Sequence, residues 1–372
     1  MLILAAILAI FVYGVIAAML GTILPDLSKK FGLTPRQNGT IATAQAIGLV
    51  IASLGVGPLI DTNGKKIALL IGLALVTLAL LRLPRSSGFT SVVTAIFILG
   101  LGGGIIVTGA NALASDVNPE ARGTTLNLLN LFFGLGGLAT PFISANLLKG
   151  DSVKLCYTAA ILALLTLGVH LIAPIPGAPA VGSATFPDFG ALLSSPTLLL
   201  ISLMLFLYVA AEVGVWNWLV RHLVAQGIPE AKALNTLSLG FALGLLLGRV
   251  AVSPILISVP AKTVTLGAAI VMAVTTYMML QARTPSLAGF WVFLAGIAMA
   301  PVFPTALAMV GDAFKENTAT AMGIAITCGW LGLVASSPII GSIGGGDAKN
   351  LKKALLVLPA ASVLLILVNL AL

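Results

Sequence analysis

The sequence has few charged residues for its length. Of its 372 residues, 8% are charged, whereas 59% are hydrophobic and the mean hydropathy is +1.13. In soluble domains about a quarter of the residues are charged, so this composition excludes a soluble domain. A helix that spans a bilayer needs roughly 20 apolar residues, which leaves room for about a dozen spans and no soluble domain.

Cysteine is also scarce, and familiar catalytic motifs are missing. Cys156 and Cys328 are far apart inside apolar runs, which excludes a disulfide framework or a metal site and predicts two small buried residues. No Walker A, GxGxxG or HExxH sequence is found, nor a pair of membrane carboxylates or a Ser/His/Asp set. We therefore predict no cofactor, no metal and no enzymatic activity.

The net charge of +8 comes from lysines and arginines scattered singly between apolar runs. This distribution indicates loop charges and interfacial side chains rather than a nucleic-acid surface, so the predicted partner is the lipid bilayer. Met1 to Leu24 lacks a basic n-region and is long enough to span, so we interpret it as a retained first helix.

Apolar runs bounded by charges, proline or glycine predict twelve transmembrane helices and an all-α membrane protein. A Pro-, Gly-, Ala- and Ser-rich stretch predicts an inter-bundle loop over 176–196, with an N-terminal six-helix bundle over 1–175 and a C-terminal six-helix bundle over 197–372. The predicted helices cover 3–25, 37–60, 67–84, 90–114, 123–147, 154–175, 197–220, 232–257, 262–282, 286–310, 318–343 and 351–372.

Two segments indicate an internal repeat. Residues 112–141 and 306–338 both run from Ala-Leu-Ala through a charged turn into a glycine-bearing helix that reaches a proline. This supports a duplicated six-plus-six arrangement, which is typical of one large transporter class. Gly240, Gly244 and Gly248 form a small-residue stripe that predicts close helix packing.

The loop between the second and third predicted helices reads Gly57-Pro-Leu-Ile-Asp61-Thr-Asn-Gly64-Lys65-Lys66. It resembles the loop signature of the major facilitator superfamily, with Thr62 where a basic residue is usual. The resemblance implies a latch that holds one facing state, to which we assign Gly57, Asp61, Gly64, Lys65 and Arg122. A plain surface turn is the alternative.

Glu212 is a carboxylate inside the seventh predicted helix, where ionisable groups are functional by default. Tyr208, Glu212 and Trp216 follow at i, i+4 and i+8 and so share one face. An aromatic face suits a sugar ring, and a carboxylate can accept hydroxyl hydrogen bonds or carry a proton. Structural pairing of Glu212 with Arg221 or Asn235 is the alternative.

Other polar residues in the predicted spans complete the candidate substrate site. Amides, hydroxyls and indoles can bind neighbouring sugar hydroxyls, although hydrogen bonding between helices is an equal alternative for each of them. With the seventh-helix face, the predicted substrate-binding residues are Tyr13, Gln45, Asn111, Asn127, Asn130, Tyr208, Glu212, Trp216, Asn217, Thr305 and Trp330.

Beyond this loop, the chain resembles the fucose/galactose/glucose:proton symporter family of the major facilitator superfamily. The resemblance rests on segments in matching order, which include Ile23-Leu24-Pro25, Gly109-Ala110-Asn111, Leu126-Asn127-Leu128, Tyr208 through Trp216, Gly248-Arg249 and Phe303-Pro304-Thr305. It implies a major facilitator fold and transport of a monosaccharide by alternating access, with proton-coupled symport and a monomer.

The chain departs from that family in its first and fourth helices. The best-known member has a membrane carboxylate in each, where this chain has Gly21 and Val107, so Glu212 is the predicted proton site. Asn130 stands at a glutamine position of that member. An uncoupled uniporter and drug or metabolite efflux by proton antiport are the alternatives, although the fifth helix lacks the Gly-Pro pair usual in exporters.

The resemblance further implies a prokaryotic inner-membrane protein with both termini in the cytoplasm. That topology conflicts with the distribution of positive charge. The cytoplasmic side would carry Lys65, Lys66, Arg122, Lys262 and Lys315, and most of the other lysines and arginines would lie on the opposite side. This contradicts the positive-inside rule. We give the Asp61 loop more weight, because it defines a face of the fold.

Overall fold

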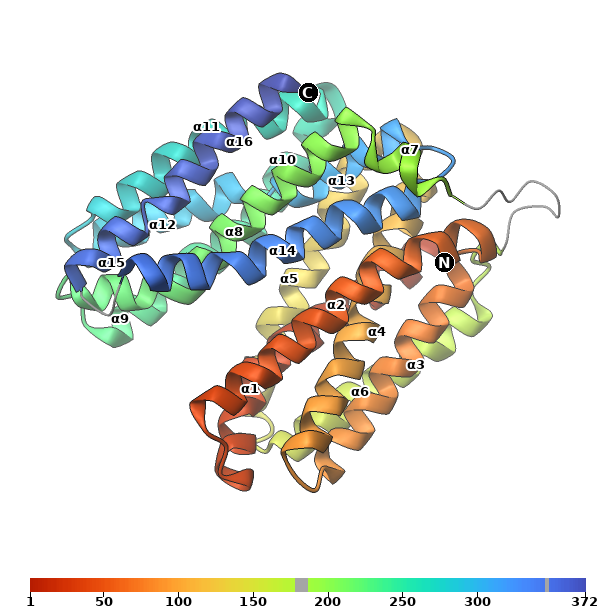
Figure 1. Cartoon of the computed structure of the whole chain (residues 1–372), viewed down its shortest axis with the longest axis horizontal. Helices are drawn as coiled ribbons and strands as arrows, with labels where there is room; N and C mark the ends of the chain where they lie inside the picture. Colours follow the sequence, from red (N-terminus) through yellow and green to blue (C-terminus); the bar gives the residue numbers. More distant parts are fainter. Residues whose placement is uncertain (178–186, 345–347) are drawn as a thin grey trace. The chain divides into compact units, whose positions relative to one another are not determined.

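The computed structural model describes residues 1–177, 187–344 and 348–372, which form helices joined by short connections (Figure 1). Within these ranges, 12 helices are long and apolar enough to cross a membrane. The predicted all-α class and the predicted number of spans are confirmed. Contacts group the described residues into two compact units.

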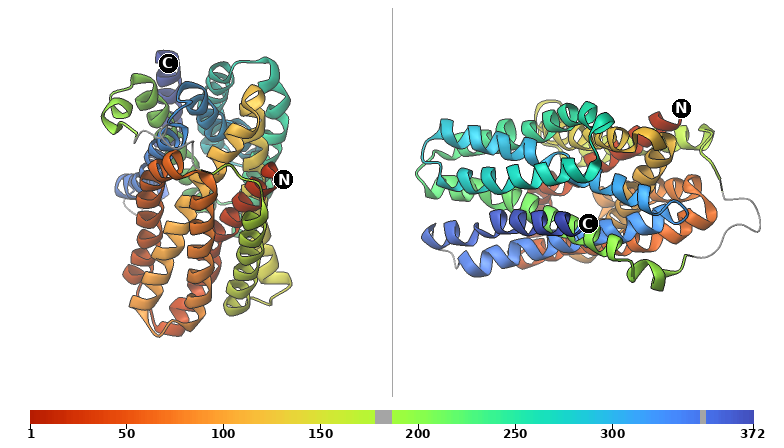
Figure 2. Two further views of the ribbon diagram at one scale, coloured as in Figure 1. Left: turned by 90° about the vertical axis from the view of Figure 1, so that its right-hand side faces the viewer. Right: turned by 90° about the horizontal axis from the view of Figure 1, so that it is seen from above.

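Unit 1 contains Met1–Pro119, Phe132–Asp188 and Phe314–Thr327. In it α4 packs on α1, α2 and α3, and α3 packs on α6, so the helices form one bundle (Figure 2). Its elements are α1 (Leu2–Phe31), α2 (Pro35–Asn63), α3 (Lys65–Arg82), η1 (Leu83–Arg85), α4 (Phe89–Val117), most of α5 (Arg122–Asn146), α6 (Ser152–Ile172) and the start of α14.

Unit 2 contains Glu120–Leu131, Phe189–Ala313 and Cys328–Leu372. In it α16 packs on α8 and α11, and α12 packs on α10 and α11. The short η2 (Pro119–Ala121) precedes α5. The other elements are α7 (Phe189–Leu193), α8 (Pro196–Ala225), α9 (Glu230–Asn235), the π-helical η3 (Thr236–Ala242), α10 (Leu243–Ser258), α11 (Ala261–Gln281), α12 (Pro285–Met299), α13 (Val302–Ala313), α14 (Thr318–Gly344), α15 (Ala348–Ala354) and α16 (Val357–Ala371).

The first helix is longer than predicted. Its predicted end was Pro25, but α1 continues through that proline and through Lys29 and Lys30 to Phe31. Gly32 then ends the helix in the left-handed conformation, with φ 61°. Thr34 starts α2 with a capping box, because its hydroxyl accepts from the Gln37 amide while the Gln37 side chain accepts from the Thr34 amide.

Close helix crossings in the two units use corresponding glycines. In unit 1, Gly48 on α2 and Gly100 on α4 each face backbone atoms of the other helix, and a Cβ at either position would overlap them. In unit 2, a Cβ at Gly244 on α10 or at Gly296 on α12 would likewise overlap backbone atoms of the other span. The two glycines of this pair are separated by the same number of residues as Gly48 and Gly100. The small-residue stripe therefore packs closely, as predicted, and the two halves share a crossing geometry.

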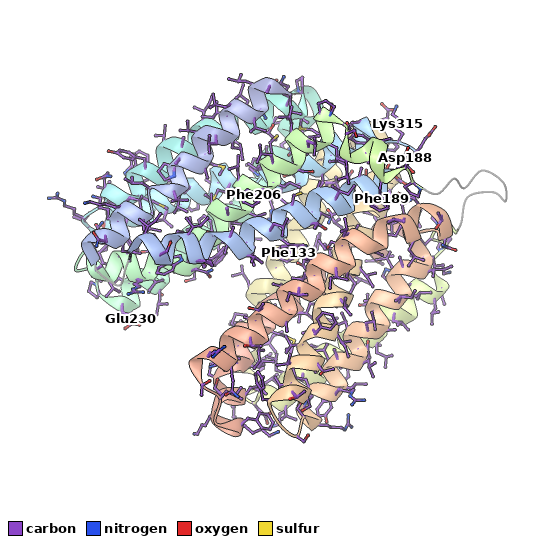
Figure 3. The ribbon with its side chains drawn as sticks, viewed as in Figure 1. Phe133, Asp188, Phe189, Phe206, Glu230 and Lys315 are labelled. Atoms are coloured by element: carbon purple, nitrogen blue, oxygen red, sulfur yellow. The ribbon has the colours of Figure 1, made fainter. Side chains whose placement is uncertain are left out.

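A second pair of crossings repeats the pattern. Gly14 on α1 faces the backbone of Phe133 on α5, and Gly332 on α14 faces the backbone of Phe206 on α8 (Figure 3). Glycine allows this approach because it has no Cβ. The fifth helix of each half thus packs on the first helix of the same half.

The helices α5 and α14 each contribute to both units. Glu120–Leu131, which includes the start of α5, belongs to unit 2, and Phe314–Thr327, which includes the start of α14, belongs to unit 1. The predicted bundles over 1–175 and 197–372 divide the chain in sequence order, and that division stays a prediction. In the predicted inter-bundle loop over 176–196, residues 178–186 lie outside the described part of the chain.

Candidate functional site

Unit 2 contains a buried polar group of residues at its helix contacts, which we call the Arg249 cluster. Its members are fully or almost fully buried, and they come from four helices of the same unit. The cluster comprises Asn127 and Asn130 of α5, Tyr208 of α8, Arg249 of α10 and Thr305 of α13.

Arg249 is the charged member of the cluster. Its side chain is 5% exposed, and one guanidinium nitrogen donates to the backbone carbonyl of Asn130 at 2.5 Å. Its Nε has no hydrogen-bond partner among the described residues. A buried arginine normally has a carboxylate partner or several acceptors, so this guanidinium is only partly compensated.

Tyr208 is close to both Arg249 and Glu212. Its ring is completely buried, and its hydroxyl lies within electrostatic range of both the Arg249 guanidinium and the Glu212 carboxylate. The hydroxyl forms no hydrogen bond in the part of the chain that the structure describes. Tyr208 therefore connects the cluster to the predicted proton site.

Glu212 and Trp216 extend from this tyrosine along the same face of α8, as the i, i+4 spacing predicts. Glu212 is partly buried, and the Trp216 indole donates to its carboxylate at 3.5 Å. The Trp216 ring is 38% exposed and contacts Phe241 edge-on at 5.2 Å. Arg221, the predicted alternative partner of Glu212, lies instead over the Trp218 ring.

Asn127 and Thr305 join α5 to α13. The Asn127 amide nitrogen donates to the Thr305 hydroxyl at 3.0 Å, while its carbonyl oxygen has no hydrogen-bond partner among the described residues. Asn130 lies one turn further along α5 and donates to Leu126 within the helix. The structure thus brings four of the predicted substrate-binding residues into one cluster, namely Asn127, Asn130, Tyr208 and Thr305.

The remaining predicted substrate-binding residues lie elsewhere. In unit 1, Tyr13 stacks on Phe133 at 5.2 Å, the buried Asn111 donates to Val107 of its own helix, and Gln45 is half-buried. In unit 2, Asn217 donates to the Ser337 hydroxyl at 2.9 Å, and Trp330 is partly buried on α14.

The Asp61 loop forms a helix cap within unit 1. Asp61 lies in the last turn of α2, and its carboxylate accepts from the backbone amides of Ala319 and Thr320 at 3.1 and 2.8 Å and from the Thr320 hydroxyl at 2.6 Å. These amides belong to the first turn of α14, where backbone N–H groups have no carbonyl acceptor within the helix. Asp61 therefore caps a helix that is distant in sequence, where a carboxylate also complements the helix dipole.

The other predicted latch residues are two glycines near this cap and two basic residues in ion pairs. A Cβ at Gly57 would overlap the backbone of Thr320, and Gly64 turns the chain between α2 and α3 with φ 85°. Lys65 pairs with Asp116 at 2.7 Å. The fifth predicted latch residue, Arg122, pairs with Asp312 within unit 2.

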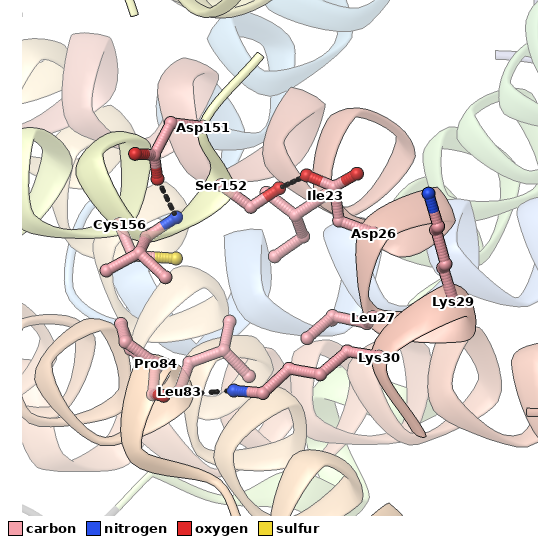
Figure 4. A pocket seen from close by; sticks show the side chains of 11 residues that line it. Ile23, Asp26, Leu27, Lys29, Lys30, Leu83, Pro84, Asp151, Ser152 and Cys156 are labelled. Atoms are coloured by element: carbon pink, nitrogen blue, oxygen red, sulfur yellow. Dashed lines mark hydrogen bonds between the residues drawn. The ribbon is translucent and has the colours of Figure 1, made fainter. Parts of the chain in front are cut away.

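A surface pocket of about 510 Å³ lies in unit 1, between the end of α1, η1 and the start of α6 (Figure 4). Lys30 donates to the Pro84 carbonyl across it, and Ser152 donates to Asp26. Asp151 caps α6 by accepting from the amides of Val153 and Lys154 at 3.0 Å. The pocket contains none of the predicted substrate-binding residues.

Arg249 is the functional candidate that sequence reasoning missed. It appeared only as part of a Gly-Arg pair that resembled the symporter family. The available signal was a cation near the middle of the eighth span, which the structure places at residues 230–258. No group of three or more metal-binding side chains lies among the described residues.

Membrane-length helices with repeated crossings, and polar groups buried inside one unit, define a polytopic membrane protein. A model of the Major Facilitator Superfamily matches residues 6–337, and the chain belongs to that family. The members of this family are transporters and not enzymes. The protein is therefore a multi-pass integral membrane protein.

The chain is similar in fold to the Escherichia coli fucose:proton symporter FucP, with a TM-score of 0.83 and 19% identity over 99% of this chain and 98% of that one. The resemblance to that symporter family is thereby confirmed for the fold. A TsgA homolog of Citrobacter koseri is 21% identical over 89% of this chain and 84% of its own length.

A 4-hydroxybenzoate transporter, PcaK of Pseudomonas aeruginosa, is 32% identical over 149 residues. That match covers 40% of this chain and 33% of the relative, so the chain spans about a third of it. The comparisons thus establish the family and the fold.

Proposed function

We propose that this protein takes up a monosaccharide-sized hydroxylated solute by alternating access, in symport with a proton that binds Glu212. The observation that carries the proposal is the face of α8. Glu212 is the acidic residue nearest the middle of any described span, and Tyr208 and Trp216 lie beside it. Ionisable groups at such positions commonly serve proton relays.

The chemistry of this face suits a sugar. The partly exposed Trp216 ring offers an apolar platform for the C–H face of a pyranose. The Glu212 carboxylate and the Asn127 carbonyl oxygen can accept hydroxyl hydrogen bonds, while Tyr208 can donate one. Binding energy would come from a few such bonds and one stacked ring, as in other small-molecule sites.

The Asp61 cap is the proposed latch. It joins the end of α2 to the start of α14 through three hydrogen bonds that involve an ionised acceptor. Because α14 continues into unit 2, making and breaking this cap would bias which facing state is populated.

Uptake into proteoliposomes, with and without a pH gradient, tests the proposal. We expect Glu212→Gln to reduce uphill hexose uptake to the level of protein-free liposomes while hexose exchange continues, because the amide cannot carry the proton but keeps most of the hydrogen bonds. Glu230→Gln, at the exposed start of α9 (Figure 3), is the matched control and should accumulate the sugar normally. Unchanged proton-driven accumulation by the Glu212 variant would refute the assignment.

The same assay should include 4-hydroxybenzoate as a second candidate substrate. The relative named for that compound makes it a reasonable probe, and it carries a hydroxyl like a sugar and also a carboxylate. Uptake without any dependence on the pH gradient would identify an uncoupled uniporter, and outward transport of a hydrophobic cation would favour efflux.

We also infer a location in the prokaryotic plasma membrane, with a monomeric chain and both termini on the cytoplasmic side. This inference follows the position of the Asp61 loop between α2 and α3, against the distribution of lysine and arginine.

A further inference from the structure

Arg249 carries a buried positive charge that no carboxylate in direct contact balances among the described residues. The ion pairs Lys65–Asp116, Arg122–Asp312 and Lys154–Asp151 do not include Arg249, and no carboxylate of a described residue pairs with it. One backbone carbonyl accepts from its guanidinium, and its Nε is unpartnered at 5% exposure. Burial of an incompletely paired charge is costly, so such a group in a span is retained for a ligand or a coupling role.

The internal repeat shows that the fold itself does not need this charge. Arg249 follows Gly244 in α10 at the same interval at which Ser53 follows Gly48 in α2. Both glycines make the same type of crossing with the fourth helix of their half. A small neutral residue therefore serves at the corresponding place in unit 1, and the cation is specific to unit 2.

The groups around Arg249 can complete a site for a planar anion. The guanidinium presents donors in a fixed fork that matches the two oxygens of a carboxylate. The Tyr208 hydroxyl beside it is a further donor without a satisfied partner, and Asn127 offers an unpartnered carbonyl oxygen for a substrate hydroxyl. These groups lie on α8, α10 and α5 within one unit.

We propose that Arg249 binds the carboxylate of the transported solute, so that the substrate is a small hydroxylated monocarboxylate, such as a sugar acid or a hydroxylated aromatic acid. The proposal rests on the transport function above and specifies its substrate class. A neutral hexose could use the Trp216 ring and the amides but would leave the guanidinium unpaired. A purely structural role, in which Arg249 only fixes the Asn130 carbonyl, is the competing explanation.

Ligand-dependent thermal stabilisation of the purified full-length protein separates these explanations. The probes are two pairs that differ in a carboxylate: glucose with glucuronate, and 4-hydroxybenzyl alcohol with 4-hydroxybenzoate. We expect at least one acid to raise the melting temperature at concentrations where its neutral counterpart does not. The pair that responds distinguishes a sugar acid from an aromatic acid.

Substitutions then assign the effect to the guanidinium. Arg249→Gln should weaken stabilisation by the acid at least about tenfold, because a charge-assisted fork is lost. Arg249→Lys keeps the charge without the fork, and we expect it to bind the acid with intermediate affinity, which also covers the case in which the glutamine variant fails to fold. Arg221→Gln, at an exposed arginine on α8, is the matched control and should bind normally.

Three outcomes overturn the proposal. The first is stabilisation by the neutral compounds alone, the second is stabilisation by none of the four probes, and the third is undiminished stabilisation of Arg249→Gln by the acid. Proton-driven glucose uptake that depends on Glu212, without any response to glucuronate or 4-hydroxybenzoate, would leave the proposed transport function intact and refute only the carboxylate site. Loss of proton-dependent transport for all probes would instead refute the transport proposal.

Discussion

The buried Tyr208 hydroxyl lies near two charged groups, Arg249 and Glu212, and forms no hydrogen bond to either. Such a buried hydroxyl costs stability when its hydrogen bonds are poorly formed, while the ring beneath it packs completely. We expect Tyr208→Phe to leave the melting temperature unchanged or slightly higher and to lower substrate uptake several-fold. Thermal unfolding and initial uptake rates measure the two effects. Uptake at the normal rate would show that the hydroxyl has no part in the site.

Asp151 allows a pH test outside the spans. Hydrogen bonds from the backbone amide and side chain of Lys154 hold the pKa of this carboxyl below its usual range. A lowered folded-state pKa gives stability that is present above the unfolded value of about 3.9 and is lost as the pH falls through the folded value. We therefore expect Asp151→Ala to melt slightly lower than the wild type near pH 7, with a difference that shrinks below about pH 4.

Ser195 provides the control for this titration. It caps α8 by accepting from the Leu198 amide, and its hydroxyl does not titrate in this range. The deficit of Ser195→Ala should stay constant over the same pH interval. A parallel pH dependence in both variants would contradict the role assigned to the Asp151 carboxylate.

Residue identity and spacing predicted part of the site. The face shared by Tyr208, Glu212 and Trp216 followed from the helical period, because neighbours at i and i+4 are fixed by local geometry. The contact of Arg249 with the Asn130 carbonyl could not be predicted in this way. It joins two helices that are distant in sequence, and only their packing brings the groups together.

At the scale of elements, the crossing of α2 with the start of α14 depends on one missing side chain. A Cβ at Gly57 would overlap the backbone of Thr320, whereas Gly55 has open space around it. We expect Gly57→Ala to destabilise the protein by about 1–3 kcal/mol, as overpacking does, and to reduce uptake by displacing the first turn of α14.

Gly55→Ala is the matched variant on the same helix. It should be neutral or more stable by up to about 1 kcal/mol, because alanine favours the helix. Thermal unfolding and uptake of the two variants give the comparison. Equal behaviour of both would show that the tight contact at Gly57 does not constrain the helix pair.

Helix number was predictable from hydropathy, but helix ends and interruptions were not. The apolar run ended at Pro25, yet α1 continues for another turn and a half because a helix can extend past the apolar core into the interface. The π-helical η3 inside the eighth span has no signature in its apolar sequence. Such departures arise where packing of neighbouring helices overrides local preference.

At the scale of the whole molecule, the proposed site determines the net charge that crosses the membrane in each transport cycle. A monocarboxylate on Arg249 together with one proton on Glu212 crosses the membrane as a neutral pair. A neutral sugar with one proton would carry one positive charge, for which 100 mV supplies about 2.3 kcal/mol, or roughly fiftyfold accumulation.

We therefore expect uptake of the acid to respond to a pH gradient and not to an imposed potassium diffusion potential. Proteoliposomes with valinomycin measure the two driving forces separately, and the neutral hexose serves as the comparison. Accumulation of the acid driven by an inside-negative potential alone would show that more than one proton accompanies each anion.

The Asp61 cap also has a consequence for biosynthesis. The carboxylate and Gly57 are made early, but the amides and backbone that they contact, at Ala319 and Thr320, are made after nearly all of the chain has been synthesised. Domains usually fold in order as they emerge from the ribosome. In this protein the first six helices can insert in sequence, but unit 1 completes its contacts only when the eleventh span arrives, so a nascent chain must hold the end of α2 uncapped until then.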